Sequence, residues 1–339
     1  MALTVAVSST FEKLFQQNPL VAAELARTLY APNETAEFFG GGRLQPNNKE
    51  YAVLSRADLA VQIQAFQKAF TENGSMDFIG AEHKLHHVKV DTTFAPDDLS
   101  DSFYTFLEGL EENDRSKWPF ARWYINVHLV PAVNQDKELR VDYKGRTGAT
   151  TPGTANFNAS EGFGSQINDW ITATDITPFT LAPSATPETF VGQLVDFVKS
   201  VRDSAPEVKE MYYSGDFDYV CMSPENHEKF IQGMDDKYNG AYERVGSEIL
   251  TTDAKMVVKN IPGTMVKTIG LRSMIGSDKI VMAPKWNRFG KIKSQGRKNS
   301  PLSGIRDGGR EVWVSMDWKT RVGHYLPAYV FTNNQDLAF

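Results

Sequence analysis

The apolar residues of this chain switch repeatedly between the spacing of a helix and that of a strand, and this feature constrains the fold most. Residues 99–110 place apolar side chains three and four positions apart, as one face of a helix does. Residues 312–318 alternate apolar and other side chains, which is the period of a strand. Helices and strands interleave without a regular βαβ rhythm, so the pattern favours an α+β fold over a doubly wound sheet.

The second half carries clear helix starts. Thr186-Pro187-Glu188 and Ser223-Pro224-Glu225 each place proline in the first turn, where its missing N–H costs nothing. They predict helices from about 187 and 224. We expect strands at residues 217–222, 256–258, 265–269 and 280–282.

Several elements are less regular. Apolar spacing predicts helices in residues 11–29 and 59–70, with a glycine-rich linker at 40–48 between them. A helix carrying Phe120 and Val127 is expected to end or kink at Pro131. Residues 139–143 alternate and predict a strand. Residues 71–97 read as an extended, poorly buried arm or hairpin.

Bulk properties limit the class of protein. A length of 339 residues suggests about two domains. The net charge of -6 lacks the basic excess of proteins that wrap nucleic acid. One cysteine excludes an internal disulfide. The first ten residues lack the positive charge of a secretory signal, and no apolar run would span a membrane, so we expect synthesis in the cytoplasm.

No group of residues makes a convincing catalytic, cofactor or metal site. His83, His86 and His87 are the best metal candidates, but a site needs three or four converging ligands, and a solvated arm is the simpler interpretation. Cys221 lies within a predicted strand, where burial would make it inert. His324 has no evident partner, so packing or an interface explains it better than catalysis. We therefore expect a structural protein that assembles with copies of itself.

Charge is distributed unevenly along the chain. An acidic segment follows residue 96, and a basic segment runs from residue 285 to 310. They are two solvated faces or complementary patches that set the register between neighbouring subunits. The candidate contact residues are Asp97, Asp98, Asp101, Glu108, Glu111 and Glu112 on the acidic side, and Lys285, Arg288, Lys291, Lys293, Arg297 and Lys298 on the basic side.

Two blocks of sequence resemble the major capsid protein of tailed bacteriophages, with its Hong Kong ninety-seven type fold. The first contains Trp-Pro-Phe-Ala-Arg-Trp-Tyr at 118–124, Val-Pro at 130–131 and Lys-Glu-Leu-Arg-Val-Asp-Tyr-Lys-Gly at 137–145. The second contains Ile-Val-Met-Ala-Pro-Lys-Trp-Asn at 280–287, residues 311–318 and Gly-His-Tyr-Leu-Pro at 323–327. The order of elements matches over roughly residues 80–332.

The resemblance implies a peripheral domain with a spine helix, an axial domain, an extended loop and an N-terminal arm. The corresponding ranges are an N-terminal arm with helices at 1–70, an extended loop at 71–97, a peripheral domain at 98–157, an axial domain at 158–285 and returning strands at 286–339. The residues of the family's lysine–asparagine crosslink find no match, so none is transferred.

The implied function is an icosahedral shell of hexamers and pentamers around double-stranded DNA, which is held without sequence readout. Implied partners are copies of the chain and portal, scaffolding and decoration proteins, with no membrane. The implied location is the virion capsid, after assembly in the host cytoplasm. The alternatives are an encapsulin-like compartment, a metal-dependent hydrolase using the histidines near His83, and a tail-fibre type binding protein.

Overall fold

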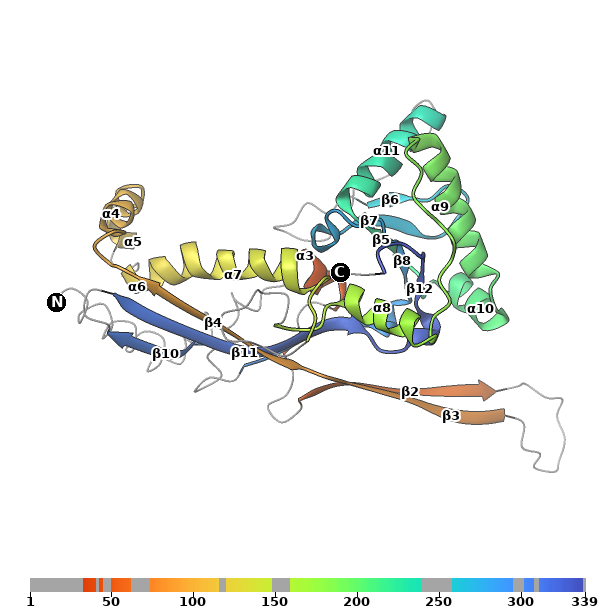
Figure 1. The fold of residues 1–339 in the computed structure, drawn as a ribbon, viewed down its shortest axis with the longest axis horizontal. Helices are drawn as coiled ribbons and strands as arrows, with labels where there is room; N and C mark the ends of the chain where they lie inside the picture. The colour runs from red at the N-terminus through yellow and green to blue at the C-terminus, as the bar shows by residue number, and fades with distance from the viewer. Residues whose placement is uncertain are drawn as a thin grey trace.

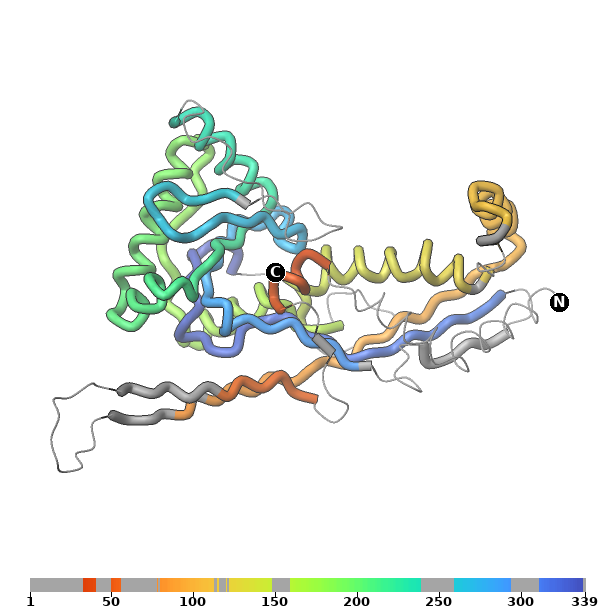
Figure 2. Tube along the Cα trace, turned by 180° about the vertical axis from the view of Figure 1, so that it is seen from behind, coloured from red at the N-terminus to blue at the C-terminus, as the bar shows by residue number. Residues whose placement is uncertain are grey.

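The computed structural model describes residues 33–40, 43–44, 50–61, 74–115, 120–147, 159–238, 258–294, 302–307 and 311–337. They form an elongated molecule (Figure 1). A twisted sheet covered by a long helix makes one part, an α/β body makes the other, and a two-stranded hairpin projects beneath the body (Figures 1 and 2). The predicted α+β class is confirmed.

The first sheet is organised around its longest strand, β11. The strands are β11 (Val312–His324), β4 (His86–Phe94), β9 (Arg288–Ser294), β10 (Leu302–Asp307) and β1 (Arg43–Leu44). Antiparallel β4 pairs with β11 along one edge, while β10 and then β9 pair with the other edge. Strand β1 pairs in parallel with β9, within the range expected to be a linker. The predicted alternation at 312–318 is confirmed, because Val312, Val314, Met316 and Trp318 are all buried.

One face of this sheet is covered by a continuous long helix. It consists of α6 (Phe120–Trp123), a π-helical segment (Tyr124–Leu129), α7 (Val130–Asp136) and a second π-helical segment (Lys137–Val141). Two short helices, α4 (Ser100–Glu108) and α5 (Glu112–Arg115), precede the N-terminal end of this long helix in the chain. Phe94 stacks on Tyr124 at 4.0 Å between ring centroids, and Phe103 packs against Trp123.

Pro131 was expected to end or kink this helix, and an end at this residue is wrong. The helix continues, because the π-helical segment just before the proline changes the hydrogen bonding in the turn where its ring and missing N–H would interfere. Residues 139–143 are not a strand, because Lys137, Glu138, Val141 and Asp142 are buried at helical spacing. Three of these four side chains are charged, so apolar spacing alone could not reveal the helix.

The α/β body surrounds a second sheet in the order β12-β8-β5-β7-β6. The strands are β5 (Tyr219–Met222), β6 (Val258–Asn260), β7 (Lys267–Gly270), β8 (Val281–Met282) and β12 (Phe331–Thr332). The helices are α8 (Phe163–Thr172), α9 (Pro187–Arg202), α10 (Pro206–Ser214) and α11 (Pro224–Tyr238). The predicted starts of α9 and α11 are confirmed, as are the strands near 220, 258, 267 and 281.

The hairpin is formed by β2 (Tyr51–Val61) and β3 (Gly74–Lys84), which pair only with each other among the described strands. The helix predicted from Leu59 is therefore wrong at that residue, because cross-strand pairing overrides the local apolar spacing. The range 71–97 is divided between this hairpin and β4. Its second part is not poorly buried, because Leu85 and Val88 are 1% and 8% exposed.

The helix predicted at 11–29 and residues 62–70 of the helix predicted at 59–70 lie outside the described residues, as do Arg297 and Lys298. Within the described residues, no helix combines the length and apolar character needed to cross a membrane.

Candidate assembly surfaces

The base of the hairpin is fixed to the rest of the molecule. Ala52 and Leu85 are buried in one apolar cluster with Phe289 and Tyr325. His83 stacks on Phe289 at 5.3 Å between ring centroids, and its Nε2 lies 2.8 Å from the carbonyl oxygen of Tyr325. Burial lowers the pKa of His83, which favours the neutral ring that donates this bond. The hairpin therefore leaves the molecule at a defined point.

Beyond this base the hairpin has little cover. Phe78 is 74% exposed, and Val53 is 48% exposed. An isolated pair of strands is marginally stable in water, and unpaired strand edges invite pairing with another chain. The hairpin thus presents apolar side chains and backbone hydrogen-bonding groups that a neighbouring molecule could cover.

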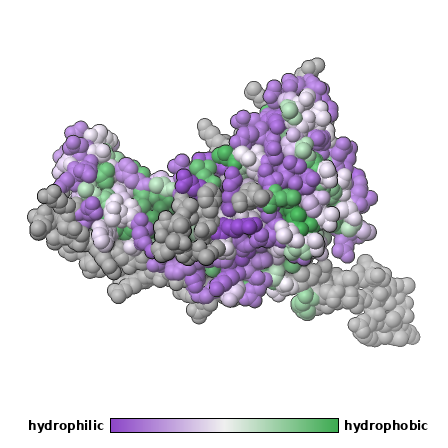
Figure 3. Space-filling view, in the orientation of Figure 1, coloured by the Kyte–Doolittle hydropathy of each residue, from purple (hydrophilic) through white to green (hydrophobic). Residues whose placement is uncertain are grey.

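The acidic segment occupies the opposite end of the molecule, in and around α4 (Figure 1). We call it the acidic end; its candidate residues Asp97, Asp98, Asp101, Glu108, Glu111 and Glu112 are all exposed. Tyr104 beside them is 61% exposed. Hydrophilic residues cover α4 in the space-filling view (Figure 3). All six predicted acidic positions are therefore accessible at this end of the molecule.

The basic segment is less uniform. Lys285 is exposed, and Lys291 and Lys293 of β9 are partly exposed. Arg288 differs, because its guanidinium is buried, forms an ion pair with Asp218 and lies 4.3 Å from the centroid of the Phe38 ring. This side chain is engaged within its own chain.

The acidic end and the lysines of β9 lie far apart on the sheet. The acidic end follows Phe94, which pairs with Val312 at one end of β11, whereas Lys291 pairs with Arg321 near the other end. Nine strand residues at about 3.3 Å each separate them by roughly 30 Å. This exceeds the Debye length of about 8 Å at physiological salt, so the acidic end and these lysines do not neutralise each other within one chain.

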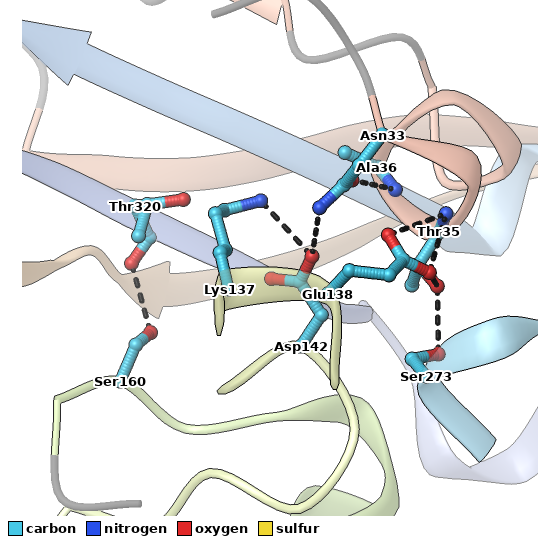
Figure 4. Close-up of polar contacts among 9 residues, drawn as sticks. All are labelled: Asn33, Thr35, Ala36, Lys137, Glu138, Asp142, Ser160, Ser273 and Thr320. Atoms are coloured by element: carbon cyan, nitrogen blue, oxygen red, sulfur yellow. Dashed lines mark hydrogen bonds and ion pairs between the residues drawn. The ribbon is translucent and has the colours of Figure 1, made fainter. Parts of the chain in front are cut away.

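A buried polar cluster joins three segments that are distant in the sequence (Figure 4). It comprises Asn33 and Thr35 of the segment around α3 (Glu34–Phe38), Lys137, Glu138 and Asp142 at the end of the long helix, and Ser273 in a 3-10 turn (Arg272–Met274). We call it the junction cluster. Sequence reasoning missed it, because no local pattern marks charged residues that are buried against remote partners.

The three histidines that were the best metal candidates each contact a different partner. His86 Nε2 lies 3.8 Å from Glu161, and His87 Nε2 lies 3.7 Å from Asp317, while His83 faces Tyr325. Among the described residues, no three histidine, cysteine or acidic side chains could hold a metal ion together.

The other two candidates are buried. Cys221 lies in β5, where burial raises the pKa of its thiol to about 12. His324 is 1% exposed, packs against Phe39 and Phe163, and has its pKa lowered to about 3, mainly by burial. The predicted burial of Cys221 and the packing role of His324 are confirmed.

No protein-family model and no curated protein matches this chain. Several solved structures do match this chain. A satellite phage P4 procapsid chain is 10% identical over 92% of this chain and 89% of its own, with a TM-score of 0.47. A virus-like particle from Pyrococcus furiosus is 9% identical, covering 92% and 96%, with a TM-score of 0.44.

The chain is similar as well to the SrpI encapsulin complex from Synechococcus elongatus, with 10% identity, 93% and 95% coverage and a TM-score of 0.43. Identities of this size concern the fold alone, and no residue's role is transferred from these proteins. These three structures are a phage procapsid, a virus-like particle and an encapsulin complex.

Proposed function

We propose that this protein is a major capsid protein, which assembles into hexamers and pentamers of a closed icosahedral shell around phage double-stranded DNA. The observation that carries the proposal is the projecting β2–β3 hairpin, whose strands pair with no other described strand and whose Phe78 is 74% exposed. Ordering such an arm costs conformational entropy, which contacts with a neighbouring subunit would offset. Ring-forming subunits use contacts of this kind, in which one surface meets a different surface on the next copy.

The charge layout supports the same proposal. The acidic end and the lysines of β9 are too far apart to meet within one chain, but each can meet its complement on a neighbour. The net charge of -6 suits a container that confines DNA rather than one that binds it by charge. Portal, scaffolding and decoration proteins would be further partners of such a shell.

The direct test is electron microscopy and light scattering of the purified protein. Closed particles, rings or sheets support the proposal, and particles that protect DNA from nuclease identify a phage capsid. Particles that enclose protein without DNA would instead indicate an encapsulin-like compartment. A strictly monomeric protein at every concentration and salt tested would contradict both.

A hairpin-shortened variant is expected to fold but not to assemble. Residues 56–79 would be replaced by an Asn-Gly turn, which joins Ser55 to its cross-strand partner Gly80 and keeps the cluster at the hairpin base, with Leu54 and Ala81 packed against it. The deleted strand residues pair only with each other, so we expect a melting temperature close to that of the wild type and no particles by light scattering. Particle yield equal to the wild type would show that the hairpin is not an assembly arm.

Charge reversal at the acidic end is expected to weaken assembly more than folding. The variant Asp101→Lys/Glu108→Lys is compared with Glu207→Lys/Glu210→Lys, which reverses two exposed acids of α10. Each peripheral ion pair contributes roughly 0–1 kcal/mol, but the loss recurs at every contact of a shell. We expect a lower particle yield and a weaker salt dependence for the first variant only. A fall in melting temperature with unchanged particle yield would argue against a contact at the acidic end.

A further inference from the structure

The junction cluster attaches the segment around α3 to the rest of the molecule. The Asn33 amide donates to Asp142 at 3.0 Å. The backbone N–H of Thr35 donates to both carboxyl oxygens of Glu138 at 3.3 Å, and the Thr35 hydroxyl lies 2.5 Å from the same carboxyl. Figure 4 shows these side chains pointing toward one another between α3, the long helix and Ser273.

The charges in this cluster are unequal. Lys137 donates to Asp142 at 3.0 Å, so this cation and this anion form a pair. Glu138 accepts its hydrogen bonds from the neutral donors of Thr35. Glu138 is itself only 3% exposed. Two carboxyl groups therefore share one buried ammonium, and burying a second anion without a cation is costly.

The hydrogen-bond chain accommodates a proton on Glu138. The Thr35 hydroxyl contacts both Glu138 at 2.5 Å and Ser273 Oγ at 2.6 Å, but it carries a single hydrogen. With Glu138 ionised, Ser273 donates to Thr35, which donates to the carboxylate. With Glu138 protonated, the direction of donation reverses: the Glu138 carboxyl donates to the Thr35 hydroxyl, which donates to Ser273.

We propose that the junction cluster is a proton-controlled latch, which holds residues 33–39 against the long helix while Glu138 carries a proton and loosens when Glu138 ionises. The latch goes beyond the proposed function, because it acts within one chain and is measured on the unassembled protein. In a shell, the latch would make the attachment of residues 33–39 to the long helix depend on pH.

The electrostatics of the surroundings agree with this role. Burial, and secondly the charge of Asp142, raise the pKa of Glu138 to about 7, although Thr35 and Lys137 act in the opposite direction. Burial likewise raises the pKa of Glu34 on α3, against the attraction of Arg272 on the facing turn, and burial raises that of Glu37. The neighbouring acids of α3 therefore respond to pH in the same direction.

The sign of the pH effect follows from linkage. A carboxyl whose pKa is higher in the closed state binds a proton more tightly there, so the latch is most stable below the ordinary value of 4.5. Its stability falls as pH rises through about 7. Between pH 6 and pH 8, one such proton changes the opening equilibrium about tenfold.

Hydrogen exchange of the full chain tests the latch. The peptide covering residues 33–40 reports opening, since the amide of Thr35 is hydrogen bonded to Glu138 across the latch, and α9 serves as the internal reference. We expect the protection factor of this peptide, relative to α9, to fall about tenfold from pH 6 to pH 8. Glu138→Gln should remain protected and lose this dependence, whereas Glu210→Gln, an exposed acid of α10, should keep it.

Two results would overturn the latch. One is a wild-type protection factor that does not change between pH 6 and pH 8, which needs no variant. The other is an equal pH dependence in the wild type and Glu138→Gln. Neither result bears on particle formation, so failure of the latch is distinguishable from failure of the proposed shell.

Discussion

Asp218→Ala is expected to lower the free energy of unfolding by about 3–5 kcal/mol, because it leaves the buried Arg288 guanidinium without its anion. The Arg288 side chain is 5% exposed and that of Asp218 15%, so both charged groups are largely removed from water. Lys285 also lies 3.8 Å from Asp218, so removing the carboxylate would leave Lys285 and Arg288 as two cations close together. Urea denaturation followed by circular dichroism measures the change.

The double variant Asp218→Ala/Arg288→Met separates a lost ion pair from a stranded charge. Replacing a buried pair by apolar residues is often neutral, so we expect the double variant to recover most of the stability. Asp169→Ala, which breaks the half-exposed pair with Arg146, should cost only roughly 0–1 kcal/mol. A loss in the double variant as large as that in Asp218→Ala would refute the stranded-charge explanation.

Gly233→Ala is expected to destabilise the α/β body by about 2–3 kcal/mol through overpacking. Helix α11 crosses the start of α9 so closely that a Cβ at Gly233 would lie 2.2 Å from the carbonyl oxygen of Pro187. The obstacle is backbone, which cannot rotate away, so the two helices must separate.

Gly192→Ala on α9 provides the matched control. A Cβ at this position meets nothing within 4 Å, and alanine favours a helix over glycine by roughly 0.8–1.0 kcal/mol. We therefore expect opposite shifts in melting temperature from the same substitution on two facing helices. Equal shifts would mean that contact between α9 and α11 does not determine the effect at Gly233.

The elements that sequence reasoning placed correctly share strong local signals. Pro187 and Pro224 mark helix starts, and the alternation from Val312 to Trp318 identifies a strand with one buried face. The resemblance to shell proteins likewise rested on the order of such elements. The exposure of the acidic segment follows from its composition, since carboxylates without partners remain in water.

The failures occurred where remote partners override a local pattern. Leu59 belongs to a strand because β3 pairs with it, and residues 137–141 remain helical because their charged side chains find buried partners. Arg288 belonged to a basic run by sequence, yet the fold brings it to Asp218.

The sequence by itself therefore determined the α+β class, the main helix starts and the position of the charged segments, because each depends on spacing or composition over a few turns. Only the tertiary structure decided the projecting hairpin, the continuous long helix and the junction cluster. Thr35 meets Glu138 across 103 positions and Ser273 across 238. A contact over such separations forms only when the whole chain is folded, so its residues carry no local signal.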